Sequence, residues 1–435
     1  MLTFWLRRLI FTGLTLLLVS LVVFGLSELA PSNIARNTLG VTITPEQEAS
    51  FNAQNGLDQP AWARYLRWML GSDWQAARLI GRPVTRLSDP ATGRADWWEV
   101  GPGGAHYQHY SPDGETLVRV VRDAAGQRRE VTLGPDAWTA DADGRLTFWG
   151  VDRAGHAALW VKGANAAELT LTDAGWISTP GAPVRYLPLQ RGLLRGDPGI
   201  SLYTRRPVTE TLAGRLRNTA ILAGLAFAFI MPLALALGVL AGVSEGRALD
   251  RLLSILGLVT TATPEFVTGV FLILIFSTWL GWLPGAVVLS SDTALFERPS
   301  MLALPILTLT LVELGYVLRL TRASMAEVMR TNYIRAAVLK GLPYRRVVLR
   351  HALRNALLAP ITVILLHVNW LMGGIVVVEA IFGYPGLGSF ILQAALFKDV
   401  FGLEAATMLL VLLAVATQLI ADAAYTFLNP RIRYG

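Results

Sequence analysis

Six apolar runs recur along the chain, and each is long enough to form a helix that crosses a membrane. They cover residues 9–29, 219–242, 253–280, 302–322, 356–378 and 402–424. A spanning helix needs about 20 predominantly apolar residues to cover roughly 30 Å of hydrocarbon. The pattern therefore predicts an all-α polytopic membrane protein with six transmembrane helices.

The overall composition agrees with this pattern. Hydrophobic residues make up 53% of the 435 residues, charged residues make up 16%, and the mean hydropathy is +0.45. Soluble globular chains are more polar than this. The first apolar run follows Arg7 and Arg8, and no small-x-small cleavage pattern comes after it. We therefore interpret residues 1–30 as an N-terminal anchor helix that is retained.

The distribution of Lys and Arg predicts the orientation, because positively charged short loops stay in the cytoplasm. The short loops on one side hold Arg7, Arg8, Arg247, Arg251, nine cations within 319–354, Arg431 and Arg433. Those on the other side hold only Arg298 and Lys398. We expect both termini in the cytoplasm and residues 31–217 in one large extracytoplasmic region. This placement of the +7 net charge favours a membrane protein over a nucleic-acid-binding one.

The first part of the outer region, residues 31–74, has helical signals. Thr44, Pro45 and Gln47 form a capping-box pattern, and Pro60 opens a second helix. In that second helix Trp62, Tyr65, Leu66 and Met69 recur at three- and four-residue spacing. This apolar and aromatic stripe fits either the outer membrane interface or an ordinary packed core.

Residues 75–190 instead show short alternating runs separated by turn signals. The turns read SPDGE, DAAGQ, DADGR and DRAGH, and the runs between them are rich in β-branched and aromatic residues. We expect an inserted, β-rich extracytoplasmic domain built as an antiparallel meander. The turns lack the further acids of a calcium loop, so we interpret them as hairpin turns. The chain has no cysteine, so this domain has no disulfides.

Sequence signatures of catalysis are absent from the chain. There is no GxxxxGK[ST] phosphate loop, no GxSxG elbow and no HExxH pair. His106 and His109 are close in sequence, but their spacing puts them on opposite faces of a strand, which disfavours a metal site. We therefore predict no catalytic, cofactor-binding or metal-binding residue.

Several polar or helix-breaking residues fall in the predicted membrane segments or beside them, where ionisable groups are costly. Pro264 removes a backbone donor and is expected to break the third span. The candidate residues of a translocation path are Pro264, Glu265, Glu313, His367, Asn369 and Glu379. The alternative is that these groups pair with one another inside the helical bundle.

One basic segment lies between two apolar runs. Residues 332–360 carry six cationic side chains, one histidine and no acid. Ala336, Ala337 and Gly341 place small residues on one side of a predicted helix, which allows close approach to another surface. We interpret the segment as a short helix that docks onto a cytoplasmic partner.

This segment resembles the EAA coupling loop of ABC-importer permeases, whose register is E-A-A-x3-G-x9-I-x-L-P. In that register, Arg335 replaces the Glu, Gly341 is the Gly, and His351 and Arg354 replace the Ile and Pro. These departures favour the oligopeptide/dipeptide/nickel branch. The segments TPEFVTGVF, VVVEAIFGYPGLG and LNPRIRYG extend the resemblance. Residues 75–190 have no counterpart and interrupt the outer loop between RYLRWML and LLRGDPG.

The resemblance implies a permease subunit with the ABC type I importer fold in residues 191–435. It implies a cytoplasmic coupling loop at 324–355 that contacts the ATPases through Arg335, Ala336, Ala337, Lys340, Gly341, Leu342, His351, Ala352, Leu353 and Asn355. It also implies a homologous second permease, two cytoplasmic ABC ATPase subunits that use ATP and Mg²⁺, and an extracytoplasmic solute-binding protein. This chain would then bind no cofactor and catalyse no reaction. Peptides are the expected cargo. Nickel chelates, other small solutes, or a membrane-anchored sensor or binding protein are the alternatives.

Overall fold

The computed structural model describes residues 2–29, 33–40, 42–89, 93–164, 167–172, 175–181, 183–288, 297–357, 359–361, 364 and 375–428. The chain divides into two compact units, which we describe one at a time. The first unit is Met1–Leu18, Leu212–Gln393 and Ala406–Gly435, and the second is Val19–Thr211 and Ala394–Ala405.

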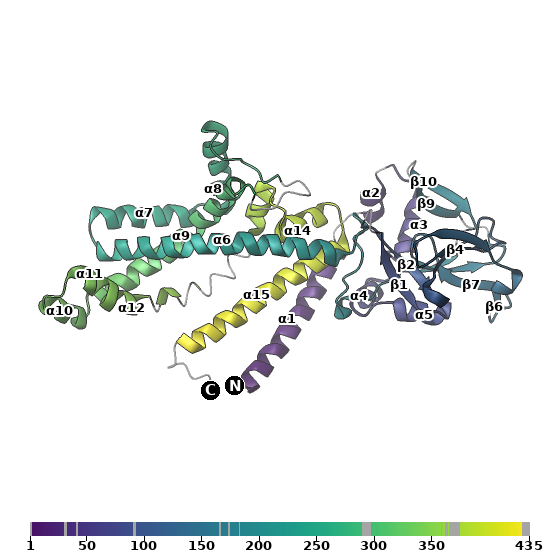
Figure 1. The fold of residues 1–435 in the computed structure, drawn as a ribbon, viewed down its shortest axis with the longest axis horizontal. Coiled ribbons are helices and arrows are strands. Elements are labelled where there is room, and N and C mark those ends of the chain that lie inside the picture. Colours follow the sequence, from purple (N-terminus) through teal and green to yellow (C-terminus); the bar gives the residue numbers. More distant parts are fainter. Residues whose placement is uncertain are drawn as a thin grey trace. The chain divides into compact units, whose positions relative to one another are not determined.

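Long apolar helices dominate the first unit (Figure 1). They are α6 (Val208–Val243), α7 (Ala248–Ala262), α8 (Glu265–Leu272), a π-helical continuation Ile273–Trp279, and α9 (Ser300–Met329), with α1 (Leu2–Leu29) and α15 (Val400–Leu428) shared between the units. Within the described ranges, α1, α6, α9 and α15 are long and apolar enough to cross a membrane alone. Two bent helix pairs raise the number of candidate spans to six if each pair is one span.

The first bent pair confirms the predicted break at Pro264. α7 and α8 meet there at 106°, because proline has no backbone N–H and its ring obstructs the preceding turn. The second pair, Ile375–Phe382 and α14 (Leu387–Leu396), bends by 71°. Gly383 in this bend has a φ of +63°, which favours glycine. Most of the predicted span 356–378 lies outside the described residues, and this second bend was not predicted.

The core of the first unit joins α6, α9 and the second bent pair. Leu222 and Ile230 of α6, Leu304 of α9, and Phe382 and Tyr384 at the bend are all fully buried. These buried apolar side chains hold the bend against the long helices. Exposing one of them to water would cost about 1.5–3 kcal/mol.

Four short helices begin the second unit. They are α2 (Ile34–Leu39), α3 (Pro45–Asn55), α4 (Ala61–Leu70) and α5 (Asp73–Ile80). The predicted capping box is confirmed, because Thr44 Oγ1 accepts from Gln47 N and Gln47 Oε1 accepts from Thr44 N. The start of α4 after Pro60 is also confirmed. α5 occupies the beginning of the range in which strands were expected, and the first strand starts at Val84.

The strands form antiparallel sheets. Their bounds are β1 Val84–Ser88, β2 Ala95–Val100, β3 His106–Tyr110, β4 Val118–Arg122, β5 Arg128–Thr132, β6 Thr139–Ala140, β7 Leu146–Val151, β8 Ala157–Val161, β9 Ala167–Thr172, β10 Gly175–Pro180 and β11 Arg185–Leu187. One sheet has the order β1-β2-β3-β4-β5, a second has β11-β8-β7-β6, and β9 pairs with β10. The predicted meander is confirmed for the first sheet, and DAAGQ, DADGR and DRAGH form hairpin turns.

Side chains from both larger sheets share one core. Trp97 of β2 packs with Val151 of β7 and Ala157 of β8. His109 is fully buried, with its Nδ1 3.0 Å from Glu99 Oε1 and its Nε2 accepting from Arg119 Nε at 2.9 Å. Its ring therefore faces a carboxylate and a guanidinium. In the described part of the chain, no group of three His, Cys, Asp or Glu is placed to hold a metal ion.

The β-rich region leaves and rejoins the helical part at one point, which we call the insert junction, Gly71 and Gly192. A Cβ on Gly71 would lie 2.2 Å from the Arg191 carbonyl oxygen, and one on Gly192 would lie 2.5 Å from Gly71 N. Ser72 N donates to Gln190 O at 2.8 Å, which closes the two ends together. Both glycines have positive φ, +86° and +97°. The backbone at the junction therefore requires glycine at both positions.

Candidate functional site

The basic segment folds into short helices at one end of α9 (Figure 1). They are α10 (Asn332–Leu339), α11 (Tyr344–Arg346), a π-helical turn Val347–Ala352 and α12 (Leu353–Ala356). Gly341 ends α10 with a φ of +76°, and its N–H donates to the Val338 carbonyl at 2.9 Å. Pro343 then starts the next helix. This glycine and proline turn the chain sharply between the two helical pieces.

One face of this segment packs against the same chain. Ile334 and Ala337 of α10 are buried with Val347 and Ala352, against Met325 of α9. Ala337 is therefore covered within this subunit. Asn355 Nδ2 donates to Tyr333 Oη at 2.8 Å, which ties the start of α10 to α12. These contacts hold the segment in a fixed position relative to the last turns of α9.

The other face of the segment is exposed and carries both apolar and cationic side chains. Leu339 is 87% exposed, and Val338, Tyr344 and Leu349 are each at least half exposed. Gly341 and Ala336 are also exposed, and Leu342, His351 and Leu353 are half-buried. The cations of the segment are Arg335, Lys340, Arg345, Arg346, Arg350 and Arg354, and none of them forms an ion pair with any described residue. We call this exposed surface, which includes Leu339 and the six cations, the coupling face.

Two charge pairs, which sequence reasoning missed, tie the ends of neighbouring helices beside this segment. Arg322 of α9 binds the buried Asp250 of α7 through two hydrogen bonds of 2.5 and 2.8 Å. Arg330 binds Glu245 through hydrogen bonds of 2.6 and 3.2 Å. The first pair is bidentate and mostly buried, so it fixes orientation better than a surface pair. The sequence could have suggested Asp250 only as an acid in the first turn of a helix.

α7 and α9 approach closely at two glycines. A Cβ on Gly315 would lie 2.2 Å from the Gly257 carbonyl oxygen and 2.4 Å from Thr260 Oγ1. Backbone atoms cannot move out of the way as a flexible side chain can. The absence of a side chain at position 315 therefore sets the distance between these two helices.

Gly315→Ala should destabilise the protein, by about 1–3 kcal/mol as for other overpacked interiors. Gly224→Ala is the matched control, because nothing lies within 4 Å of a Cβ there. In a helix that change alone favours folding by roughly 0.5–1 kcal/mol. The thermal midpoint of each purified variant should fall for position 315 and not for position 224. If the two variants had equal thermal midpoints, α7 and α9 could move apart to accommodate the added methyl group at little cost.

The predicted path residues lie in different surroundings. Pro264 is at the bend of the first pair, and Glu265 begins α8. Glu313 of α9 is 4% exposed, and α8, which Glu265 begins, packs against α9. The structure therefore places these two acids on neighbouring helices. His367 and Asn369 lie outside the described residues.

Glu379 is fully buried and serves as a hydrogen-bond acceptor for the start of α14. Gly388 N and Ser389 N donate to its Oε2 at 2.7 and 3.2 Å, and Thr219 Oγ1 of α6 donates to its Oε1 at 2.6 Å. A carboxylate at a helix N-terminus satisfies free N–H groups and complements the helix dipole. We call Glu379, Thr219, Gly388 and Ser389 the Glu379 lock. It joins α6 to the second bend, and its carboxylate has no surface open to a passing solute.

Comparison with known proteins identifies the family. The model of the binding-protein-dependent transport system inner membrane component matches residues 234–434, and the model of its N-terminal part matches residues 1–82. The oligopeptide transport system permease protein AppB of Bacillus subtilis is 35% identical over 254 residues, which cover 58% of this chain and 80% of AppB. The chain belongs to this family of inner-membrane permease proteins.

Other relatives of this permease have similar coverage. A putative peptide transport system permease protein of Brucella abortus is 37% identical over 56% of this chain and 77% of its own length. The glutathione transport system permease protein GsiC of Pectobacterium atrosepticum is 34% identical over 62% of this chain and 85% of its own length. All eleven strands of the permease described here lie between the two matched ranges.

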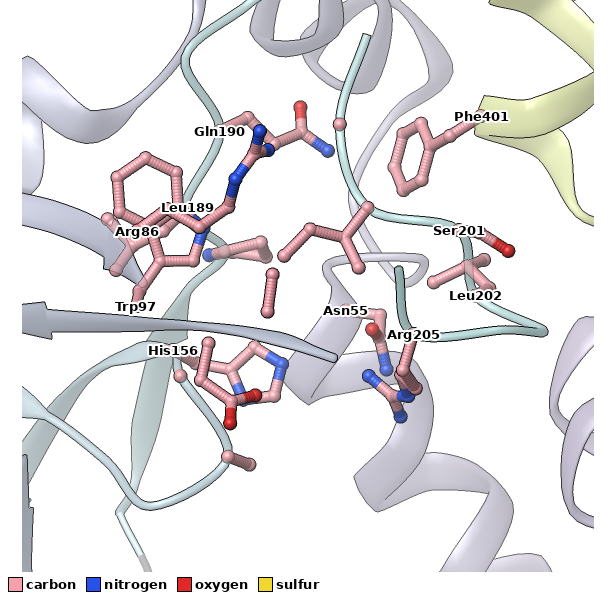
Figure 2. Close-up of a pocket in the computed structure, with 17 residues that line it drawn as sticks. Asn55, Arg86, Trp97, His156, Leu189, Gln190, Ser201, Leu202, Arg205 and Phe401 are labelled. Atoms are coloured by element: carbon pink, nitrogen blue, oxygen red, sulfur yellow. The ribbon is translucent and has the colours of Figure 1, made fainter. Parts of the chain in front are cut away.

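The second unit of the permease contains a small cavity of about 70 Å³ (Figure 2). Trp97 of β2 and His156 of the turn between β7 and β8 face Asn55, at the end of α3, and Arg205, in the loop before α6, across it. Removal from water lowers the pKa of the Arg205 guanidinium, and the nearby Asp96 carboxylate opposes that shift. The cavity is therefore part of the contact between the inserted strands and the neighbouring permease loop.

A buried ion pair closes one side of this cavity. Arg86 of β1 lies 2.8 Å from Asp197, which follows the insert junction, and both side chains are at least 86% buried. Asp197 Oδ1 also accepts from Gly199 N at 3.0 Å. These bonds fasten the first strand to the loop that leads into α6.

Proposed function

We propose that this permease is the membrane-spanning subunit of an ATP-driven ABC importer that carries peptides. The observation that supports the cargo most is the 35–37% identity to proteins named as oligopeptide or peptide transport permeases. Glutathione, the cargo in the name of a further relative, is itself a small peptide. The cargo would be delivered by an extracytoplasmic solute-binding protein, and a homologous second permease would complete the membrane part.

The coupling face is the proposed contact with an ATPase subunit. Its exposed Leu339 supplies apolar area, and the six exposed cations of the segment suit an acidic surface on the partner. Its other face is packed on α9, so a push on α10 is transmitted to a long helix of the bundle. Two separate cytoplasmic subunits would bind and hydrolyse ATP with Mg²⁺, and this chain would bind no nucleotide.

The proposed topology follows from the charge distribution. Both termini and the coupling face lie in the cytoplasm, six spans cross the inner membrane, and residues 31–217 with the β-rich insert lie outside. Glu265 and Glu313 are the proposed polar groups of the path, since both are acids on helices that pack together, α8 and α9. His367 and Asn369 remain candidates from their sequence positions.

Reconstitution tests this function. The permease, its second permease, the two ATPases and the binding protein are assembled in proteoliposomes, and ATP-dependent uptake of labelled peptides is measured against uptake of nickel chelates. We expect peptide uptake and no ATP hydrolysis by the purified chain alone. If nickel chelates were taken up and peptides were not, the proposal that peptides are the cargo would be wrong. If the isolated chain hydrolysed ATP, the proposal that separate subunits hydrolyse it would be wrong.

The insert junction predicts how the permease responds to removal of its insert. Deleting residues 72–191 joins Gly71 directly to Gly192, whose backbone atoms already touch. We expect the shortened chain to reach the membrane and to retain uptake, because the deletion removes all eleven strands, which lie outside both matched family ranges, and only residues 72–82 of a matched range. Uptake and co-purification of the binding protein are the measurements. Loss of binding-protein association with normal membrane insertion would instead assign a docking role to the insert.

A further inference from the structure

One face of α4 carries a line of large exposed apolar side chains. Trp62, Leu66 and Leu70 follow one another at four-residue steps, and are 68%, 46% and 53% exposed. Trp74 and Leu194, 49% and 68% exposed, extend the line at the end of α4. We call these five residues the α4 stripe. A soluble surface seldom gathers two tryptophans and three leucines in one place.

Hydrogen bonds hold the last two members beside the helix. Trp74 Nε1 donates to Gly71 O at 3.2 Å, and Arg195, which follows Leu194, donates to Leu70 O at 3.2 Å. The stripe is thus a fixed surface. It is formed by the two chain segments that meet at the insert junction, one around Gly71 and one after Gly192.

A second face of α4, beside the stripe, packs on the outer turns of the first membrane helix. Tyr65 Oη lies 2.7 Å from Ser20 Oγ, and its ring meets the Phe24 ring at a centroid distance of 5.3 Å. Arg64 forms an ion pair with Glu28. α4 therefore lies against residues 20–28 of α1, which are part of the apolar span Ile10–Glu28.

These contacts fix the depth of α4 in the membrane. At 1.5 Å per residue, the contacted residues run from Ser20, about 2 Å beyond the middle of the span, through Phe24, at about 8 Å, to Glu28, at about 14 Å. The hydrocarbon ends roughly 15 Å from the centre. The same turns of α1 expose Leu21, Val22 and Leu26 by 57%, 50% and 63%. The stripe continues this lipid-facing surface at the level of the outer leaflet.

We propose that the α4 stripe is embedded in the outer leaflet, at the boundary between acyl chains and headgroups, with lipid as its occupant. Tryptophan is favoured at this boundary, and a helix with one apolar face lies in its plane. Arg78, whose guanidinium lies 5.8 Å from the Trp74 ring centroid, and Arg195 supply cations at headgroup level. The sequence left two environments open for this helix, a packed core or the outer membrane interface. In this proposal one face of α4 is in the core and another face meets lipid.

The absence of cysteine allows a direct test on the full chain. Trp62→Cys, Leu66→Cys and Leu70→Cys are made singly, spin-labelled, and measured in nanodiscs, alone and in the assembled importer. Collision of each label with oxygen, which partitions into lipid, is compared with collision with a water-soluble nickel chelate. Leu21→Cys on α1 is the lipid control, and Val131→Cys on β5, 42% exposed, is the water control.

We expect the three α4 labels to resemble the label at position 21, with oxygen collisions exceeding nickel collisions. Nickel collisions at the level of position 131 would place the stripe in water and overturn the proposal. Low collision with both agents would mean that protein covers the stripe and would overturn it as well. Because all three side chains are exposed, the substitutions leave the packed face of α4 intact.

Discussion

Gly341→Val should abolish uptake in the reconstituted importer while leaving the amount of permease in the membrane unchanged. Position 341 has a φ of +76°, where a β-branched residue is strained by at least about 1–2 kcal/mol. The strain falls at the turn that joins α10 to α11, so relieving it would move the coupling face away from its seat on α9. ATP-driven uptake and immunoblotting of membranes are the two measurements.

Two further substitutions test why glycine is needed at position 341: for its backbone conformation or for its small size at a partner contact. Nothing lies within 4 Å of a Cβ at position 341, so this chain leaves room for a side chain. If backbone conformation is what matters, Gly341→Asn should retain more uptake than Gly341→Ala, because asparagine tolerates positive φ. If a partner needs a small residue there, the order is reversed. Normal uptake by Gly341→Val would remove the position from the coupling mechanism.

Glu379→Ala should cause the largest loss of stability among single substitutions in the described membrane helices. It leaves the N–H groups of Gly388 and Ser389 and the Thr219 hydroxyl without their acceptor in a buried place. Each such group costs about 1–3 kcal/mol when unsatisfied. We expect little folded permease in membranes and a sharply lower thermal midpoint for what remains.

Matched variants show whether the hydrogen bonds are responsible. Glu379→Gln keeps an acceptor oxygen of the same reach, so it should be markedly milder. Gly386→Ala keeps the carboxylate but places a Cβ 1.9 Å from Glu379 Oε1, so it should resemble Glu379→Ala. Glu297→Ala removes an exposed acid and should change nothing. A stable Glu379→Ala variant would mean that water or α6 replaces the lost acceptor.

Local signals in the sequence were sufficient for several elements of the fold. The capping box at Thr44, the helix start after Pro60 and the break at Pro264 depend on residues that are adjacent in sequence, and the structure confirms each. Hairpin turns such as DADGR are also local signals. They predicted a meander, and the strand order of the first sheet confirms it. Each of these features is determined by a few neighbouring residues, so one sequence contains the information.

Features that join distant segments could not be predicted in this way. Asp250 meets Arg322 across 72 positions, and Glu379 meets Thr219 across 160. Glu379 was a candidate path residue because acids in membrane segments are costly, and that argument does not distinguish a solute contact from a buried hydrogen-bond acceptor. The bend near Gly383 was not predicted. Apart from Glu379, the sequence just before it is apolar up to Phe382, so hydrophobicity alone does not show where that helix ends.

The coupling segment was found by its charge pattern and its resemblance, but its faces could not be assigned from sequence. Small size suggested one contact face for Ala336, Ala337 and Gly341. In the structure Ala337 is covered by α9, and Ala336 is exposed. The exposed Leu339 was not singled out, because a leucine in a short helix is more often buried than exposed.

The touching glycines at positions 71 and 192 have an evolutionary meaning. A domain whose ends meet at one point can be gained or lost in a single recombination event, and the chain on either side keeps its path. The same geometry suits laboratory use, because a fluorescent or affinity module with neighbouring termini fits the same attachment point. Transport proteins can in this way acquire new domains while every membrane helix keeps its length and register.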